Sequence, residues 1–138
     1  MAKTVCRERG FTLTELLIVV VIIGILTAIT YPAYRGFVLQ SNRSDAHISL
    51  LEASQQLERW FTENNTYAGY TYNGTDITTS GSAAASRQGH YALQFTADPG
   101  ASGYTLGATA SGDQASDSEC ITLTIDQTGL RTPAGCWD

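Results

Sequence analysis

Near the N-terminus, Gly10 and Phe11 form a possible cleavage site, and Glu15 nearby carries a charge that needs a partner. A basic segment, residues 1–10, gives way at Gly10-Phe11 to an apolar run, residues 16–29, that has no charged residue. Glu15 lies at the start of this run, and a carboxylate is costly in lipid unless a cation meets it. Cleavage between Gly10 and Phe11 would create such a cation, the new α-amino group. The pattern therefore predicts proteolytic processing that keeps the apolar segment in the mature chain.

Two other interpretations of this N-terminus can be compared with processing at Gly10. A secretory signal is cut after its apolar core, beside small residues. A cut near Ala28 would discard Glu15 and half of the long helix expected below, so this interpretation is disfavoured. An uncleaved signal anchor would keep the apolar segment in the membrane and would give Glu15 no new amine.

The residues around the proposed cut, Arg-Glu-Arg-Gly-Phe-Thr-Leu-Thr-Glu-Leu-Leu-Ile-Val-Val-Val-Ile, resemble the class III leader and first turns of type IV prepilins. The resemblance covers roughly residues 1–35, with Thr14 where the family more often has Ile. It implies that a prepilin peptidase cuts after Gly10 and methylates Phe11. The Glu15 carboxylate could pair with the new amine of a neighbouring subunit, so we expect Glu15 to act in assembly.

The apolar segment is long enough to cross a membrane once. Residues 11–30 would span roughly 30 Å at ~1.5 Å per residue, about the thickness of the hydrocarbon core. Gly24 and Pro32 weaken a helix, one by its flexibility and the other by its missing donor. We expect a kink near Pro32 and no helix end. The resemblance implies that the stretch between Gly24 and Pro32 loosens on filament entry, although Gly24 could instead be a small residue for close helix contact.

The helix is expected to continue to residue 63 as an amphipathic element. Apolar residues recur at spacings of three and four, which predicts one core-facing stripe. The stripe contains Ala46, Leu50, Ala53, Leu57 and Trp60, with Phe61 beside it. The opposite, solvent-facing side is expected to carry Asp45, Glu52, Glu58, Arg59 and Glu63. His47 and His90 have no metal-ligand spacing and are interpreted as ordinary polar or capping residues.

A loop and a small sheet are expected to follow. Residues 64–89 are rich in Asn, Thr, Ser, Gly and Ala, so we expect a connection with little regular structure. Its tyrosines, Tyr67, Tyr70 and Tyr72, could form an exposed patch, but we expect at least two to pack inward. Alternation then predicts three strands paired as an antiparallel meander. Their apolar faces are Tyr91, Leu93 and Phe95; Tyr104, Leu106 and Ala108; and Ile121, Leu123 and Ile125.

The three cysteines predict one disulfide outside the cytoplasm. Cys6 lies in the basic leader, which the positive-inside rule assigns to the cytoplasmic side. Its removal leaves Cys120 and Cys136, which can form one bridge in an oxidising compartment. The ending from Cys120 to Trp137, together with helix residues 51–64, resembles PilE-like minor pilins.

The charge balance bears on possible partners. The leader holds three of the eight basic and one of the thirteen acidic residues, so its removal leaves a formal charge of −7. Nucleic-acid binding usually needs a basic patch, and beyond Arg59 only Arg87 and Arg131 are basic. Binding of nucleic acid is therefore disfavoured. No nucleophile–base set, metal cluster or phosphate loop is recognised, so we expect neither an enzyme nor a cofactor.

These observations predict an α+β protein with a type IV pilin fold, a long helix packed on a small antiparallel β-meander. The expected segments are the leader 1–10, membrane helix 11–31, amphipathic helix 32–63, loop 64–89 and sheet region 90–138. The resemblance implies a pilus subunit, and we interpret it as a minor pilin of the bacterial inner membrane that later joins an extracellular pilus. Its expected partners are other pilins, a prepilin peptidase, the inner-membrane assembly machinery and, before assembly, the membrane. The alternatives are a type II secretion pseudopilin, which the cysteine-closed ending disfavours, and a surface receptor for DNA or adhesion ligands.

Overall fold

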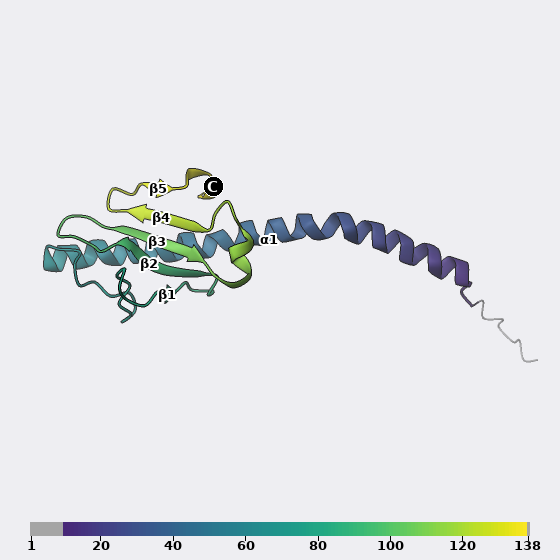
Figure 1. Cartoon of the computed structure of the whole chain (residues 1–138), viewed down its shortest axis with the longest axis horizontal. Coiled ribbons are helices and arrows are strands. Elements are labelled where there is room, and N and C mark those ends of the chain that lie inside the picture. Colours follow the sequence, from purple (N-terminus) through teal and green to yellow (C-terminus); the bar gives the residue numbers. More distant parts are fainter. Residues whose placement is uncertain (1–9, 138) are drawn as a thin grey trace, which may run out of the picture. The chain divides into compact units, whose positions relative to one another are not determined.

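The computed structural model describes residues 10–137, so Cys6 and most of the expected leader lie outside the described residues. The chain divides into two compact units, Met1–Phe37 and Val38–Asp138, which are considered separately. Helix α1, Leu13–Asn64, contributes residues to both units (Figure 1). Its bounds agree with the predicted helix to within two residues.

Helix α1 is one continuous element of 52 residues. Pro32 lies inside it and does not end it, as expected. Within the described part of the chain, α1 is the one helix long and apolar enough to cross a membrane, judged by length and composition. The described residues bury none of the side chains in its most apolar window.

The second unit contains a five-stranded antiparallel sheet in the order β1-β2-β3-β4-β5. The three central strands are those that the alternation predicted: β2 (Tyr91–Ala97), β3 (Thr105–Ala110) and β4 (Thr122–Asp126). The edge strands β1 (Ala84–Ala85) and β5 (Arg131–Thr132) were not predicted, because two residues are too few to show an alternation. Two short 3₁₀ helices, η1 (Gly112–Ser116) and η2 (Ala134–Cys136), complete the unit.

The core lies where the sheet covers the C-terminal part of α1 (Figure 1). The predicted stripe supplies four fully buried side chains, Ala46, Leu50, Ala53 and Leu57. The sheet contributes the apolar faces that were predicted for β2 and for residues 104–108. Leu106 of β3 pairs in register with Phe95 of β2 and with Ile125 of β4. This arrangement confirms the expected helix-on-meander fold.

Ile121 does not share the buried face of Leu123 and Ile125, which corrects the prediction for this strand. Its side chain is 42% exposed, and β4 begins only at Thr122. Cys120, bonded to Cys136, is itself buried. Residues 120 and 121 form a bend just before β4, so the alternation that buries Leu123 and Ile125 does not extend back to Ile121.

The connection after α1 is better packed than its composition suggests. Tyr67, Tyr70 and Tyr72 are all buried, which confirms the expectation that at least two pack inward. Ile77 in the same segment is fully buried, and its carbonyl accepts the Phe95 amide at 2.8 Å. The loop therefore forms part of the core.

Candidate functional site

The first turn of α1 is capped by Thr12. The Thr12 Oγ1 atom accepts the Glu15 amide at 3.2 Å, and the Thr12 carbonyl accepts the Leu16 amide. The spacing Thr12-x-x-Glu15 is that of a capping box, a local signal that the sequence reasoning missed. Glu15 therefore lies in the first turn, where the helix dipole favours a carboxylate. Gly10 and Phe11 precede the helix, with the Phe11 side chain 85% exposed.

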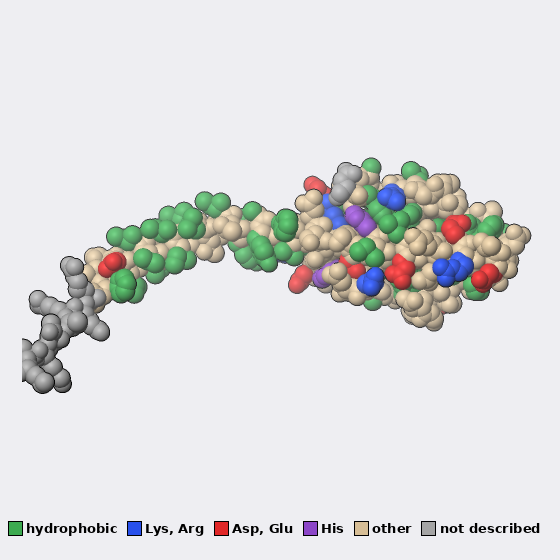
Figure 2. Space-filling model, turned by 180° about the vertical axis from the view of Figure 1, so that it is seen from behind, with side chains coloured by type: hydrophobic (Ala, Val, Ile, Leu, Met, Phe, Trp, Pro, Cys, Tyr) green, Lys and Arg blue, Asp and Glu red, His purple; other side chains and the backbone are tan. Residues whose placement is uncertain are grey.

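An exposed apolar surface follows the capped turn. The large side chains from Leu13 to Ile29 are between half and four-fifths exposed, and Tyr31, Tyr34 and Phe37 extend this surface. Figure 2 shows hydrophobic side chains around the N-terminal part of the helix. Glu15 is the one charged residue in residues 11–34. A surface this apolar requires lipid or other protein around it.

Helix α1 has one internal hydrogen bond fewer at Pro32. Pro32 has no amide to donate to the carbonyl one turn earlier. Thr27 Oγ1 donates to the Ile23 carbonyl at 2.7 Å, a back-bond that slightly destabilises and often bends helices. A methyl group on Gly24 would meet nothing within 4 Å. Among residues 10–137, no packing within the chain requires glycine at this position.

A polar cluster joins α1 to the segment around η1. Arg43 donates to Asp117 through two bonds, Nε to Oδ2 at 2.8 Å and Nη2 to Oδ1 at 2.9 Å. Gln114, which is 1% exposed, donates from Nε2 to the Leu39 carbonyl and to the Tyr91 hydroxyl, both at 3.0 Å. The Asp117 hydrogen bond raises the pKa of the Arg43 guanidinium, so this group stays charged. No local periodicity signals the contacts of Leu39 and Arg43, because their partners lie more than 70 residues away.

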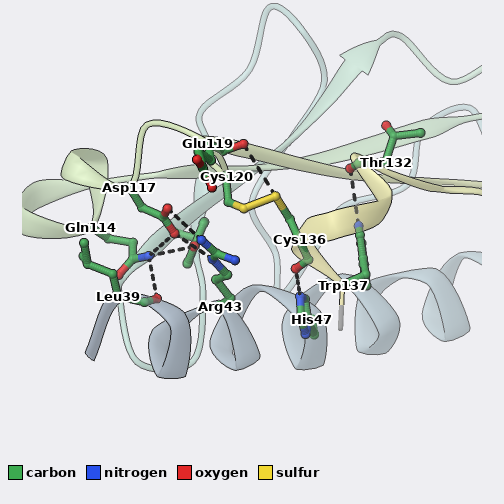
Figure 3. The surroundings of a disulfide bond; sticks show 11 residues. Leu39, Arg43, His47, Gln114, Asp117, Glu119, Cys120, Thr132, Cys136 and Trp137 are labelled. Carbon is green, nitrogen blue, oxygen red and sulfur yellow. Dashed lines mark hydrogen bonds and ion pairs between the residues drawn. A yellow bond between two sulfur atoms is a disulfide. The ribbon is translucent and has the colours of Figure 1, made fainter. Parts of the chain in front are cut away.

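The C-terminal segment forms a second contact with α1 (Figure 3). Cys120 and Cys136 form the expected disulfide, with their Cα atoms 5.7 Å apart. The next residue, Trp137, stacks on His47 with ring centroids 4.6 Å apart, and His47 Nε2 lies 2.8 Å from the Cys136 carbonyl oxygen. The Arg131 guanidinium lies 5.2 Å from the Trp137 ring centroid. His47 therefore has a specific packing role that its spacing did not indicate.

Asp45 is buried, which corrects its expected place on the solvent-facing side of α1. Its side chain is 1% exposed. It accepts hydrogen bonds from the Ser86 hydroxyl and from the Gln88 and His90 amides. A helical residue next to the apolar stripe can be buried when a loop folds over it, and here the turn before β2 does so.

These features define a class of protein: a small antiparallel head carried on a long helix whose N-terminal part is apolar and exposed. A family model described as "Type IV minor pilin ComP, DNA uptake sequence receptor" matches residues 32–124. The prokaryotic N-terminal methylation motif matches residues 6–31. The chain belongs to the type IV pilin family.

Individual relatives agree with this assignment. The type IV major pilin PilA of Myxococcus xanthus is 42% identical over 64 residues, 46% of this chain and 29% of the relative. The type II secretion system core protein G of Pectobacterium carotovorum is 33% identical over 61 residues, 44% of this chain and 39% of the relative. Both matches span well under half of the relative's own length. A solved type IV pilin from Shewanella oneidensis aligns with a TM-score of 0.50 at 28% identity, covering 72% of this chain and 98% of that one.

Proposed function

We propose that this chain is a minor structural subunit of a type IV pilus, anchored in the inner membrane before assembly. A prepilin peptidase cuts it after Gly10 and methylates Phe11. The inner-membrane assembly machinery then moves it from the membrane into a filament of pilin subunits. The description of the matching family model supports the minor role.

The observation that carries this proposal is the exposed apolar surface of α1 with one carboxylate in its first turn. The surface suits lipid before assembly and the apolar helices of other subunits afterwards, so its burial is retained in both states. In one chain, the new α-amino group of Phe11 and the Glu15 carboxylate are separated along the helix axis. A neighbouring subunit can instead bring its own α-amino group directly to this carboxylate. Pairing between subunits would offset the cost of a charge among apolar helices and set their axial register.

The missing Pro32 amide and the Thr27 back-bond support a further step of the proposal, loosening between Gly24 and Pro32. Local loosening of this stretch would let the helix adjust as it leaves lipid and packs in the filament. A pseudopilin of a type II secretion system is the alternative within the same architecture, and the similarity to core protein G favours it. The Cys120–Cys136 closure of the C-terminal segment favours the pilus.

The test is Glu15→Ala in the native host, with Glu63→Ala as the matched control on the exposed end of the same helix. We expect both variants to be cleaved and inserted normally. Recovery of Glu15→Ala in sheared surface filaments should fall strongly, while Glu63→Ala should be recovered like the wild type. Normal recovery of Glu15→Ala would show that Glu15 is not the docking charge.

DNA binding by the head is a second candidate, since the matching family model describes a DNA uptake receptor. The head has few basic groups for such a role: Arg43 is paired with Asp117, and Arg131 lies over Trp137. Fluorescence anisotropy with labelled duplex DNA tests this candidate over a range of salt concentrations. A receptor should bind more weakly as salt rises and after Arg87→Ala. Absence of binding at low salt would remove the candidate.

A further inference from the structure

Three residues on one face of α1 are held by two segments that are distant in sequence. Leu39, Arg43 and His47 are spaced by four and so lie on one face of the helix. Gln114 binds the Leu39 carbonyl and Asp117 binds Arg43, so the first segment is residues 114–117. The second is residues 136–137, which contact His47. Figure 3 shows both segments against neighbouring turns of the helix.

The disulfide joins these two segments. Asp117 lies three residues before Cys120, and Trp137 directly follows Cys136. Both cysteines are buried, at 1% and 4% exposure. The bridge thus connects the two segments beside their contacts with the helix.

We propose that the Cys120–Cys136 bridge couples these contacts into one cooperative clasp on residues 39–47 of α1. Each segment is short: residues 114–117 overlap the five-residue η1, and residues 136–137 overlap the three-residue η2. Ordering either segment costs conformational entropy. The covalent link restricts both segments together, so that ordering one lowers the entropy cost of ordering the other. Release of one contact therefore weakens the other.

The clasp has a consequence for assembly that rests on the proposed function. If the helix loosens between Gly24 and Pro32, the clasp is the point at which loosening stops, because the Leu39 carbonyl and the Arg43 side chain are tied to the head. The coupling itself does not depend on any role in a pilus.

The test is a double-mutant cycle on the full chain in detergent micelles, read by hydrogen exchange of amides 38–48. The cycle combines Asp117→Asn with Trp137→Leu, because these residues lie on the two separate segments. It is measured with the bridge intact and with both cysteines changed to Ser. Asp113→Asn is the matched control, an exposed carboxylate on η1, the 3₁₀ helix that ends just before Asp117.

Hydrogen exchange gives the equilibrium constant for local opening of amides 38–48. With the bridge intact, we expect the double variant to increase this constant by less than the product of the increases in the two single variants. The shortfall should be about twofold to about a hundredfold, the range typical of residues in one network. Without the bridge, the two effects should multiply. A full product in the bridged protein, or the same shortfall without the bridge, would overturn the proposal.

A second measurement covers the case in which loss of the bridge unfolds the head, as shown by lost protection of β3. In the bridged protein, Asp117→Asn should speed hydrogen exchange of the Cys136 and Trp137 amides. The hydrogen bonds and ring contacts described above do not join Asp117 to either residue, so the effect would have to pass through the bridge. Asp113→Asn should leave these amides unchanged. Unchanged exchange in Asp117→Asn would refute the coupling.

Discussion

Ser86 donates its hydroxyl to the buried carboxylate of Asp45 at 2.5 Å, across 41 residues of sequence. The same Ser86 oxygen accepts the Tyr91 amide at 3.0 Å, which links the helix to the first residue of β2. Asp45 also accepts the amides of Gln88 at 3.0 Å and His90 at 3.2 Å. One carboxylate on α1 therefore orders the whole turn that leads into the central sheet.

Asp45→Asn should destabilise the head, because an amide nitrogen would replace one of two acceptor oxygens that face donors. A buried donor left without an acceptor costs about 1–3 kcal/mol. Denaturant unfolding followed by tryptophan fluorescence measures the loss. Glu63→Gln, an exposed carboxylate on the same helix, is the control and should change the free energy of unfolding by less than about 0.5 kcal/mol. An equally small change for Asp45→Asn would contradict the role assigned to this carboxylate.

Arg43→Met should lower the free energy of unfolding by about 1.5–3 kcal/mol, the usual range for hydrogen bonds to charged groups. The loss is large for an ion pair because the Arg43 and Asp117 side chains are only 16% and 7% exposed. Removing Arg43 alone leaves the Asp117 carboxylate short of donors. The double variant Arg43→Met/Asp117→Leu should therefore recover part of the lost stability. Strictly additive losses would show that the two side chains do not act as a pair.

The head should lose stability at alkaline pH because of its buried tyrosines. Burial, followed by the hydrogen bond to Glu58, raises the pKa of Tyr67 to about 12. Burial is also the main cause of the raised pKa of Tyr70, Tyr72, Tyr91 and Tyr104. The unfolded chain releases these protons near pH ~10, before the folded chain does. The free energy of unfolding therefore keeps its whole contribution from these tyrosines below that pH, and it falls as pH rises toward ~12.

Denaturant unfolding at several pH values between about 8 and about 11 measures this dependence. Tyr67→Phe removes one of the shifted groups, so its stability should fall less steeply with pH than that of the wild type. A parallel decline in both proteins would show that Tyr67 does not contribute.

Processing at Gly10 should depend on the small size of this residue. Intact-mass analysis of protein from its own host should show a chain that begins at methylated Phe11. Gly10→Leu should leave the precursor uncut, because a peptidase that draws the backbone close tolerates little side chain there. A mature chain that begins near Ala33 would contradict prepilin processing.

Much of the fold is visible in local sequence patterns. The apolar run and the three-and-four spacing of Ala46, Leu50, Ala53 and Leu57 each report one face of a regular helix, and alternation reports the faces of β2, β3 and β4. Each pattern repeats over several residues, so it can be recognised before any partner is known. The cysteine count likewise left one pair for a disulfide once Cys6 was assigned to the leader.

The contacts that hold the head on the helix depend on the tertiary structure. Asp45 has the sequence context of an exposed helical carboxylate, and it is buried only because the turn containing Ser86 folds over it. The contacts of Arg43 with Asp117 and of His47 with Trp137 join residues 74 and 90 positions apart. Local periodicity shows which face a side chain takes, but it carries no information on which distant group meets that face. The partner is decided by how the loops after α1 and β3 and the disulfide-bonded C-terminal segment close over the helix.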